Sequence, residues 1–250
     1  TNLTGLSFVN STATSADSVC YSCSLIDSAS IRKLISGNPN ITSASNAFAS
    51  CSNLTGAAPS IAEWTKLKSA SYMLRSTKIT SIPSNYFNNC ASTLESTYYA
   101  FSGCGELNTV GHDIFKNLSK LTDIRGTFSG CSKLSTFIAD DFNILPTTCN
   151  IVDMSDLFYG CSALRMPSKD SLGKPLSTLA DLFAPATKLE RADSVFWGVN
   201  TLTSEYLPDA IFENNKSLIA IVGLFNGCLG LTSLPDYLCS KTPNNNPKLL

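Results

Sequence analysis

Short apolar phrases recur along this chain, each placing aliphatic or aromatic residues among serine, threonine and glycine. The stretch 127–137 reads TFSGCSKLSTF, and close copies are AFSGCGELNTV at 100–110, LFYGCSALRMP at 157–167 and LFNGCLGLTSL at 224–234. A repeat has to be established before any secondary structure is assigned, since a missed period would misassign the whole fold. The phenylalanine of the pattern F-x-x-C-x-x-L serves as the marker of each repeat.

Successive markers follow one another at nearly equal intervals, and a single step breaks the period. We expect that step, from Phe183 to Phe196, to appear as a half-turn or a kink, because thirteen residues cannot complete a coil that elsewhere takes about twenty-seven. The markers are Cys20, Phe48, Leu74, Phe101, Phe128, Phe158, Phe183, Phe196 and Phe225.

Two further phrases complete the unit, as in ITSIPSNYF (79–87), LTSLPDYLC (231–239) and LTDIRGTF (121–128). Aliphatic residues that alternate with Ser or Thr favour short, half-buried strands, and Pro favours the start of a helical turn. Each unit therefore predicts two short strands and two tight turns, some of them 3₁₀ or one-turn helices. Such a unit cannot bury its own apolar face, whereas stacked units can. We expect a solenoid of about eight or nine coils, with Phe48, Leu74, Phe101, Phe128 and Phe158 in one internal stack.

The motifs FSGCSKLSTF (128–137) and LTSLP (231–235) resemble those of BspA-like, or Treponema-type, leucine-rich-repeat proteins and of related bacterial surface lipoproteins. The resemblance extends from about Ala13 to Cys239. It implies an α/β-type repeat solenoid: a right-handed leucine-rich-repeat stack of ~27-residue turns with short parallel strands and few short helical turns. It also implies a bacterial, secreted or cell-surface protein that acts in adhesion or protein binding. We expect one solenoid domain over 1–250, with an irregular start (1–12) and an irregular tail (240–250).

The cysteines follow the repeat. Cys20 and Cys23 form a C-x-x-C pair that could indicate a redox or zinc site, but they fall in the phenylalanine and cysteine positions of the unit, and no further zinc ligands are suitably spaced. We predict free, buried thiols that act as small apolar residues at the inward corners of the turns. Cys51, Cys104, Cys131, Cys161 and Cys228 share the position of Cys23, Cys239 occupies a phenylalanine position, Cys90 is another corner, and Cys149 lies in an insertion.

Composition limits the partners. Charged residues make up 15% of the chain, the formal net charge is −1, and no run of like charge indicates a phosphate-binding surface, so nucleic acid is not expected as a partner. No apolar run approaches the ~20 residues of a membrane helix. No obvious capping module occurs at either end of the chain, which leaves self-association through the solenoid ends open.

Catalysis would need residues other than the repeated apolar residues and cysteines. His112 is the single histidine and fits a turn, and acidic pairs such as Asp140 with Asp141, or Asp153 with Asp156, fit solvated turns better than glycosidase carboxylates. We predict no catalytic, cofactor or metal site. The chain is predicted to be a non-enzymatic binding or adhesion protein that recognises a protein or glycan through its repeat surface. The alternative is a carbohydrate-active enzyme, a lyase or glycosidase, on a parallel β-solenoid.

One aromatic cluster is a candidate binding site. The repeat places Tyr72 and Tyr99 in the same outward position of consecutive coils, with Tyr98 beside Tyr99, while Met73 and Ala100 fill the inward position. Tyrosine combines apolar area with a polar tip, which suits stacking on a sugar ring or anchoring a protein partner. The competing interpretation is that these rings only cover the surface, since the next coil has Gly126 at this position.

Overall fold

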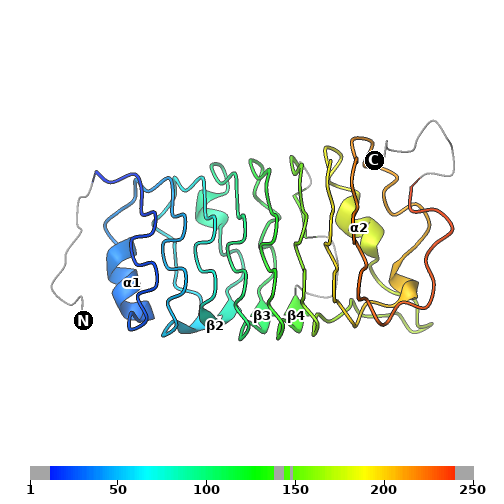
Figure 1. Ribbon diagram of the computed structural model, residues 1–250. Helices are drawn as coiled ribbons and strands as arrows, with labels where there is room; N and C mark the ends of the chain where they lie inside the picture. The colour runs from blue at the N-terminus through cyan, green and yellow to red at the C-terminus, as the bar shows by residue number, and fades with distance from the viewer. Residues whose placement is uncertain (1–11, 138–143, 147–148, 240–250) are drawn as a thin grey trace.

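The computed structural model describes residues 12–137, 144–146 and 149–239. Within these ranges the chain forms a row of stacked coils that runs from the N-terminal end, blue in Figure 1, to the C-terminal end, orange and red. The repeat solenoid expected from the period is therefore present. Its regular elements are short: α1 (Ser28–Ile35), β1 (Thr55–Ala57), β2 (Lys78–Ile82), η1 (Asn88–Cys90), β3 (Thr109–Val110), β4 (Thr136–Phe137), α2 (Leu179–Phe183) and η2 (Ser204–Tyr206).

The described strands form one small parallel sheet in the order β1-β2-β3-β4, visible along the lower edge of Figure 1. A second, longer series of contacts consists of isolated parallel bridges, one residue in each coil. We call the side of the solenoid that carries these bridges the ladder face. The bridges link Ser15, Ser43, Ser69, Ser96, Asp123, Asp153, Arg191 and Ala220, in that order.

The two strands expected in each unit are thus only partly present. The phrase at 79–87 overlaps β2, but the phrase at 121–128 contributes one bridge, at Asp123, followed by turns. Residues 231–239 contain no strand. On the ladder face, backbone N–H groups of one coil donate to carbonyls of the next at every second residue, while i to i+3 bonds close turns within the coil. Turns and ladder together satisfy the backbone without an extended strand.

Left-handed backbone residues explain the glycine of the repeated phrase. Each coil of the ladder face has two residues with positive φ, four positions apart, such as Ser18 and Ser22 in the first coil. At the second of these positions, Gly130 has φ +74, and a Cβ there would lie 3.5 Å from the Gly103 nitrogen of the preceding coil. Glycine adopts this left-handed conformation at little steric cost, whereas Ser18 and Ser22 in the first coil adopt it at a higher steric cost because they carry a Cβ.

The marker residues stack as predicted from Phe101 onward, with centroid distances of 5.8 Å between Phe101 and Phe128 and 6.1 Å between Phe128 and Phe158. Phe48 and Leu74 are also fully buried, and the hydrogen bond from Phe48 N to Met73 O aligns them in the same row. The predicted internal stack is confirmed.

The predicted defect between Phe183 and Phe196 is wrong. Phe196 stacks directly on Phe158, at 5.8 Å, and Asp153 bridges Arg191, so this coil is complete and longer than its neighbours. Phe183 belongs to a second internal row on the opposite side of the core, where its ring lies 4.5 Å from that of Phe212. It resembles a marker in sequence, because the pair Leu182-Phe183 matches two marker pairs, Leu157-Phe158 and Leu224-Phe225. The extra residues of the long coil include α2.

The cysteine position has a specific function in the ladder. In five coils the thiol donates to the backbone carbonyl of the marker residue in the preceding coil. The pairs are Cys51 with Cys20, Cys104 with Leu74, Cys131 with Phe101, Cys161 with Phe128 and Cys228 with Phe196, at 2.9–3.2 Å between sulfur and oxygen. Cysteine is therefore both a small apolar residue and a weak donor to a buried carbonyl.

The cysteines of the described residues are free, and most are buried, as predicted. Burial raises the pKa of Cys161 to about 12 and that of Cys104 to about 11. Cys23 differs from the other residues of its position because it is exposed. It lies in the first coil of the ladder, where no described coil precedes it. Cys239 is only partly buried.

Candidate functional site

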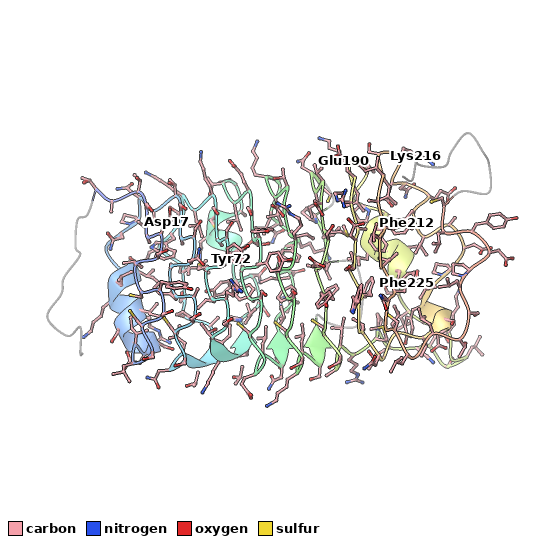
Figure 2. All side chains as sticks on the ribbon, in the orientation of Figure 1. Asp17, Tyr72, Glu190, Phe212, Lys216 and Phe225 are labelled. Carbon is pink, nitrogen blue, oxygen red and sulfur yellow. The ribbon has the colours of Figure 1, made fainter. Side chains whose placement is uncertain are left out.

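The predicted register of the tyrosines is confirmed. Tyr72 and Tyr99 occupy the same left-handed position of consecutive coils, with φ +55 and +50, while Met73 and Ala100 are fully buried. The two rings stack with their centroids 5.6 Å apart and an interplanar angle of 21°. Tyr98 meets both rings edge-on, at 5.1 Å from Tyr72 and 4.7 Å from Tyr99. All three side chains are half-buried, and Figure 2 labels Tyr72 between the two ends of the solenoid.

Two arginines complete the cluster. The Arg75 guanidinium carbon lies 5.4 Å from the centroid of the Tyr72 ring, and that of Arg125 lies 4.6 Å from the Tyr98 ring. A guanidinium over an aromatic face is attracted by the ring quadrupole. We call Tyr72, Tyr98, Tyr99, Arg75 and Arg125 the aromatic patch. The sequence analysis missed both arginines, although Arg125 occupies the position of Tyr98 in the next coil.

The two arginines differ in how they are held. Arg125 donates from Nε and Nη2 to the two carboxylate oxygens of Asp123, at 3.0 and 2.7 Å, and its Nε lies 3.8 Å from Asp153. These bonds raise its pKa and fix the guanidinium plane. Arg75 is exposed and makes no ion pair with any residue that the structure describes. Its charge is the one in this patch that remains available to an anionic group.

Tyr99 is anchored in the structure. Its hydroxyl donates to Asp156, at 2.6 Å, two coils further along. Its ring covers Gly126, where a Cβ would lie 2.4 Å from the ring carbons. Burial and the bond to Asp156 both raise the pKa of Tyr99. The row of tyrosines stops at Gly126 because the Tyr99 ring occupies the space that a side chain there would need.

A second aromatic pair lies further along the ladder face, and the sequence analysis did not identify it. Tyr159 and Trp197 stack with their centroids 5.6 Å apart, and Tyr159 is 38% exposed. Trp197 leans over Gly223 in the following coil, where a Cβ would lie 3.0 Å from the indole ring. The signal was present, since both residues directly follow the marker phenylalanine in consecutive coils.

The candidate catalytic residues make ordinary local contacts. His112 is exposed in a turn, and its Nδ1 lies 2.9 Å from Asp113. Asp153 accepts hydrogen bonds from the backbone and the side chain of Ser155. The pair Asp140 and Asp141 lies outside the described residues. Among the residues that the structure describes, no group of three or more His, Cys, Asp or Glu could hold a metal ion, and no helix is long and apolar enough to cross a membrane.

Comparison with known proteins gives few matches. No protein-family model and no curated protein matches the chain. The solved structures that resemble it include a leucine-rich-repeat protein of T. pallidum (16% identity, TM-score 0.22, covering 67% of this chain and 85% of that one). Another is a leucine-rich cell surface protein of Faecalibacterium prausnitzii A2-165 (16% identity, TM-score 0.26, 84% of this chain). A third is a complex of TLR13 with ssRNA13 (14% identity, TM-score 0.24, 82% of this chain).

Two of these neighbours are described as leucine-rich proteins, and the third is TLR13. The chain spans 49% of the Faecalibacterium protein and 36% of TLR13. At such identities and TM-scores the likeness carries no weight for function, so the solenoid rests on the chain's own bridges and ring stacks. The narrower resemblance to BspA-like proteins stays a proposal.

Proposed function

We propose that this chain is a non-enzymatic binding protein of the BspA-like leucine-rich-repeat type, secreted or held at a bacterial cell surface. It recognises a protein or glycan partner through the ladder face. The observation that carries the proposal is the aromatic patch, in which three half-buried tyrosines and two arginines meet at one point of the surface. Tyrosine and arginine are the residue types enriched in binding hot spots.

The patch is pre-ordered, which favours binding. The tyrosine rings hold one another, Tyr99 is anchored to Asp156, and Arg125 is anchored to Asp123. A partner that docks here therefore does not have to immobilise these side chains, and that ordering cost is removed from the free energy of binding. Tyr72, Tyr98 and Arg75 then supply the contact surface, while Tyr99 acts mainly as their support.

Nucleic acid remains a poor candidate partner. The net charge of −1 and the engagement of Arg125 with Asp123 leave little positive field on this face. The enzyme alternative has no specific support among the described residues, because the candidate carboxylates Asp153 and Asp156 are engaged with Ser155 and Tyr99.

The test begins with a screen of the whole chain against glycans and extracellular-matrix proteins. The affinity for the ligand found in the screen is then compared between the wild type and a double variant, Tyr72→Ser with Tyr98→Ser. This variant leaves the Tyr99 anchor in place. The matched control is Tyr159→Ser, which removes a half-exposed tyrosine of the same face outside the patch. We expect at least a tenfold loss of affinity in the double variant, an unchanged affinity in the control, and equal thermal unfolding. An unchanged affinity in the double variant would remove the patch from the proposal.

A further inference from the structure

The ladder bonds run in one direction at four positions of each coil, whereas the bond beside each bridge, such as that from Thr42 N to Thr14 O, runs the other way. At each of its seven junctions, four backbone N–H groups of one coil donate to four carbonyls of the following coil. In the first junction Ala16 and Ser18 donate to Ser43 and Ser45, and in the last Ala192 and Ser194 donate to Ala220 and Val222, at 2.8–3.0 Å. Because no described junction reverses this direction at these four positions, the two ends of the ladder must carry unlike groups.

The first coil presents acceptors and the last coil presents donors. Four carbonyls at alternate positions of the first coil accept no hydrogen bond from the described residues, and four N–H groups at the equivalent places of the last coil donate none to them. The carbonyls belong to Ser15, Asp17, Val19 and Tyr21, and the N–H groups to Ile221, Gly223, Phe225 and Gly227. Figure 2 labels Asp17 toward the N-terminal end of the solenoid and Phe225 toward the C-terminal end. The two rows match in number and in spacing.

Apolar groups accompany both rows. Val19 and Tyr21 are 42% and 55% exposed in the first coil. Beside them a cavity of about 100 Å³ lies among Ala16, Val19, Leu34, Ile41 and Trp64. At the other end Val222 and Leu229 are 67% and 82% exposed, and Phe225 is only partly buried although it continues the marker stack. Unpaired backbone and exposed apolar side chains in one place mark a surface suited to association.

We propose that a second copy of this chain docks its first coil against the last coil of its neighbour, head to tail, and continues the ladder across the contact. The backbone conformation selects this occupant over an ordinary extended peptide. The last coil has left-handed residues at Gly223 and Gly227, with φ +65 and +70, and the first coil has them at Ser18 and Ser22, with φ +53 and +56. A coil of the same conformation can pair all four groups, as every internal junction does.

The contact is heterologous, since it joins two different surfaces, and it does not close on itself. A wild-type chain that associates in this way forms open linear oligomers that lengthen with concentration. The proposal is independent of the aromatic patch, which lies on coils between the two ends.

The experiment uses the whole chain and three paired variants, measured by sedimentation velocity from micromolar to millimolar concentration. The head variant carries Val19→Asp and Tyr21→Asp, and the tail variant carries Val222→Asp and Leu229→Asp, so that each places charges at one end only. The control carries Leu172→Asp and Leu176→Asp, which replace side chains that are 91% and 62% exposed within the long coil. We expect the wild type and the control to grow beyond dimers as concentration rises, while each end variant alone stays monomeric.

Mixing supplies the decisive result. One intact tail on the head variant and one intact head on the tail variant allow a single contact, so an equimolar mixture should form a dimer and stop there. A misfolded variant could not produce this rescue. A wild type that stays monomeric throughout, an end variant that still oligomerises alone, or a mixture that stays monomeric would each overturn the proposal.

Discussion

Replacing Cys131 separates two accounts of why cysteine recurs in the repeat. If the position only needs a small apolar residue, serine should be worse there than alanine, because its hydroxyl would be buried without a partner. The structure instead gives the side chain a partner, since the Cys131 thiol donates to the Phe101 carbonyl at 3.2 Å. That carbonyl also accepts the backbone N–H of Cys104, at 3.2 Å. We therefore predict that Cys131→Ser is no more destabilising than Cys131→Ala.

The magnitudes follow from what each change removes. Cys131→Ala deletes a fully buried atom comparable to a methylene, about 0.8 kcal/mol. It leaves a cavity of roughly 20 Å³, about 0.5 kcal/mol, and it loses a weak hydrogen bond, about 0.5 kcal/mol. The expected loss is about 2 kcal/mol in the free energy of unfolding. Cys131→Ser loses the apolar contribution but keeps the donor, so the expected loss is about 1 kcal/mol.

The assay is urea unfolding followed by circular dichroism. With a slope of about 3 kcal/mol per M, a difference of about 1 kcal/mol moves the midpoint by roughly 0.3 M. Cys23→Ser is the control, because this cysteine occupies the same repeat position but is exposed. It should change the midpoint by less than the error of the fit. A Cys131→Ser variant less stable than Cys131→Ala by about 1 kcal/mol or more would refute the role assigned to the Phe101 carbonyl.

Three further predictions can be checked directly. In native alkylation followed by mass spectrometry, Cys23 should react within minutes, while Cys131 and Cys161 react only after denaturant is added; fast native labelling of either would contradict their burial. Burial raises the thiol pKa of Cys161 from its usual 9.0 to about 12, so the stability that this protonated thiol provides is complete below pH 9 and is lost as the pH rises toward 12. The midpoint of unfolding should therefore fall above pH 9, and it should fall less steeply in Cys161→Ala. Finally, Gly126→Ala should cost about 2 kcal/mol or more, because its Cβ strains the left-handed backbone and displaces the Tyr99 ring; in a Tyr99→Ala background the cost should fall to about 1 kcal/mol, and an equal cost in both backgrounds would contradict the contact.

The repeat made the internal stack predictable. Each copy repeats the same inward and outward positions, so the assignment of a position in one coil can be checked against the other coils. The register of Tyr72 and Tyr99 and the burial of Met73 and Ala100 followed from that alone. The same reasoning failed for Phe183, because the pair Leu182-Phe183 matches the marker pair Leu157-Phe158, and the pattern does not say on which side of the core a phenylalanine lies.

Other features could not be predicted from the repeat period of the sequence. Arg75 and Arg125 join the patch through ring contacts that repeat spacing does not reveal, and the anchor from Tyr99 to Asp156 spans two coils. On the ladder face, single bridges replace the expected strands, and the period did not reveal this either. Left-handed residues recur in every coil of the ladder face and exclude a continuous strand. More than half of them are not glycine, and most of these are serine or tyrosine, which carry no strong sequence signal for that conformation.

The long coil shows which side of the solenoid can vary. The chain between Asp153 and Arg191 is longer than that between any other two successive bridges, yet its ladder bonds and ring stack match those of the shorter coils. The extra residues therefore lie away from the ladder face, in the stretch that includes α2. On the ladder face the backbone is held at every second residue, while the outward side chains range from serine to arginine, tyrosine and tryptophan. A fixed backbone with freely varied side chains lets the chemistry of a surface change without altering the fold, and this makes the ladder face the stronger candidate for recognition.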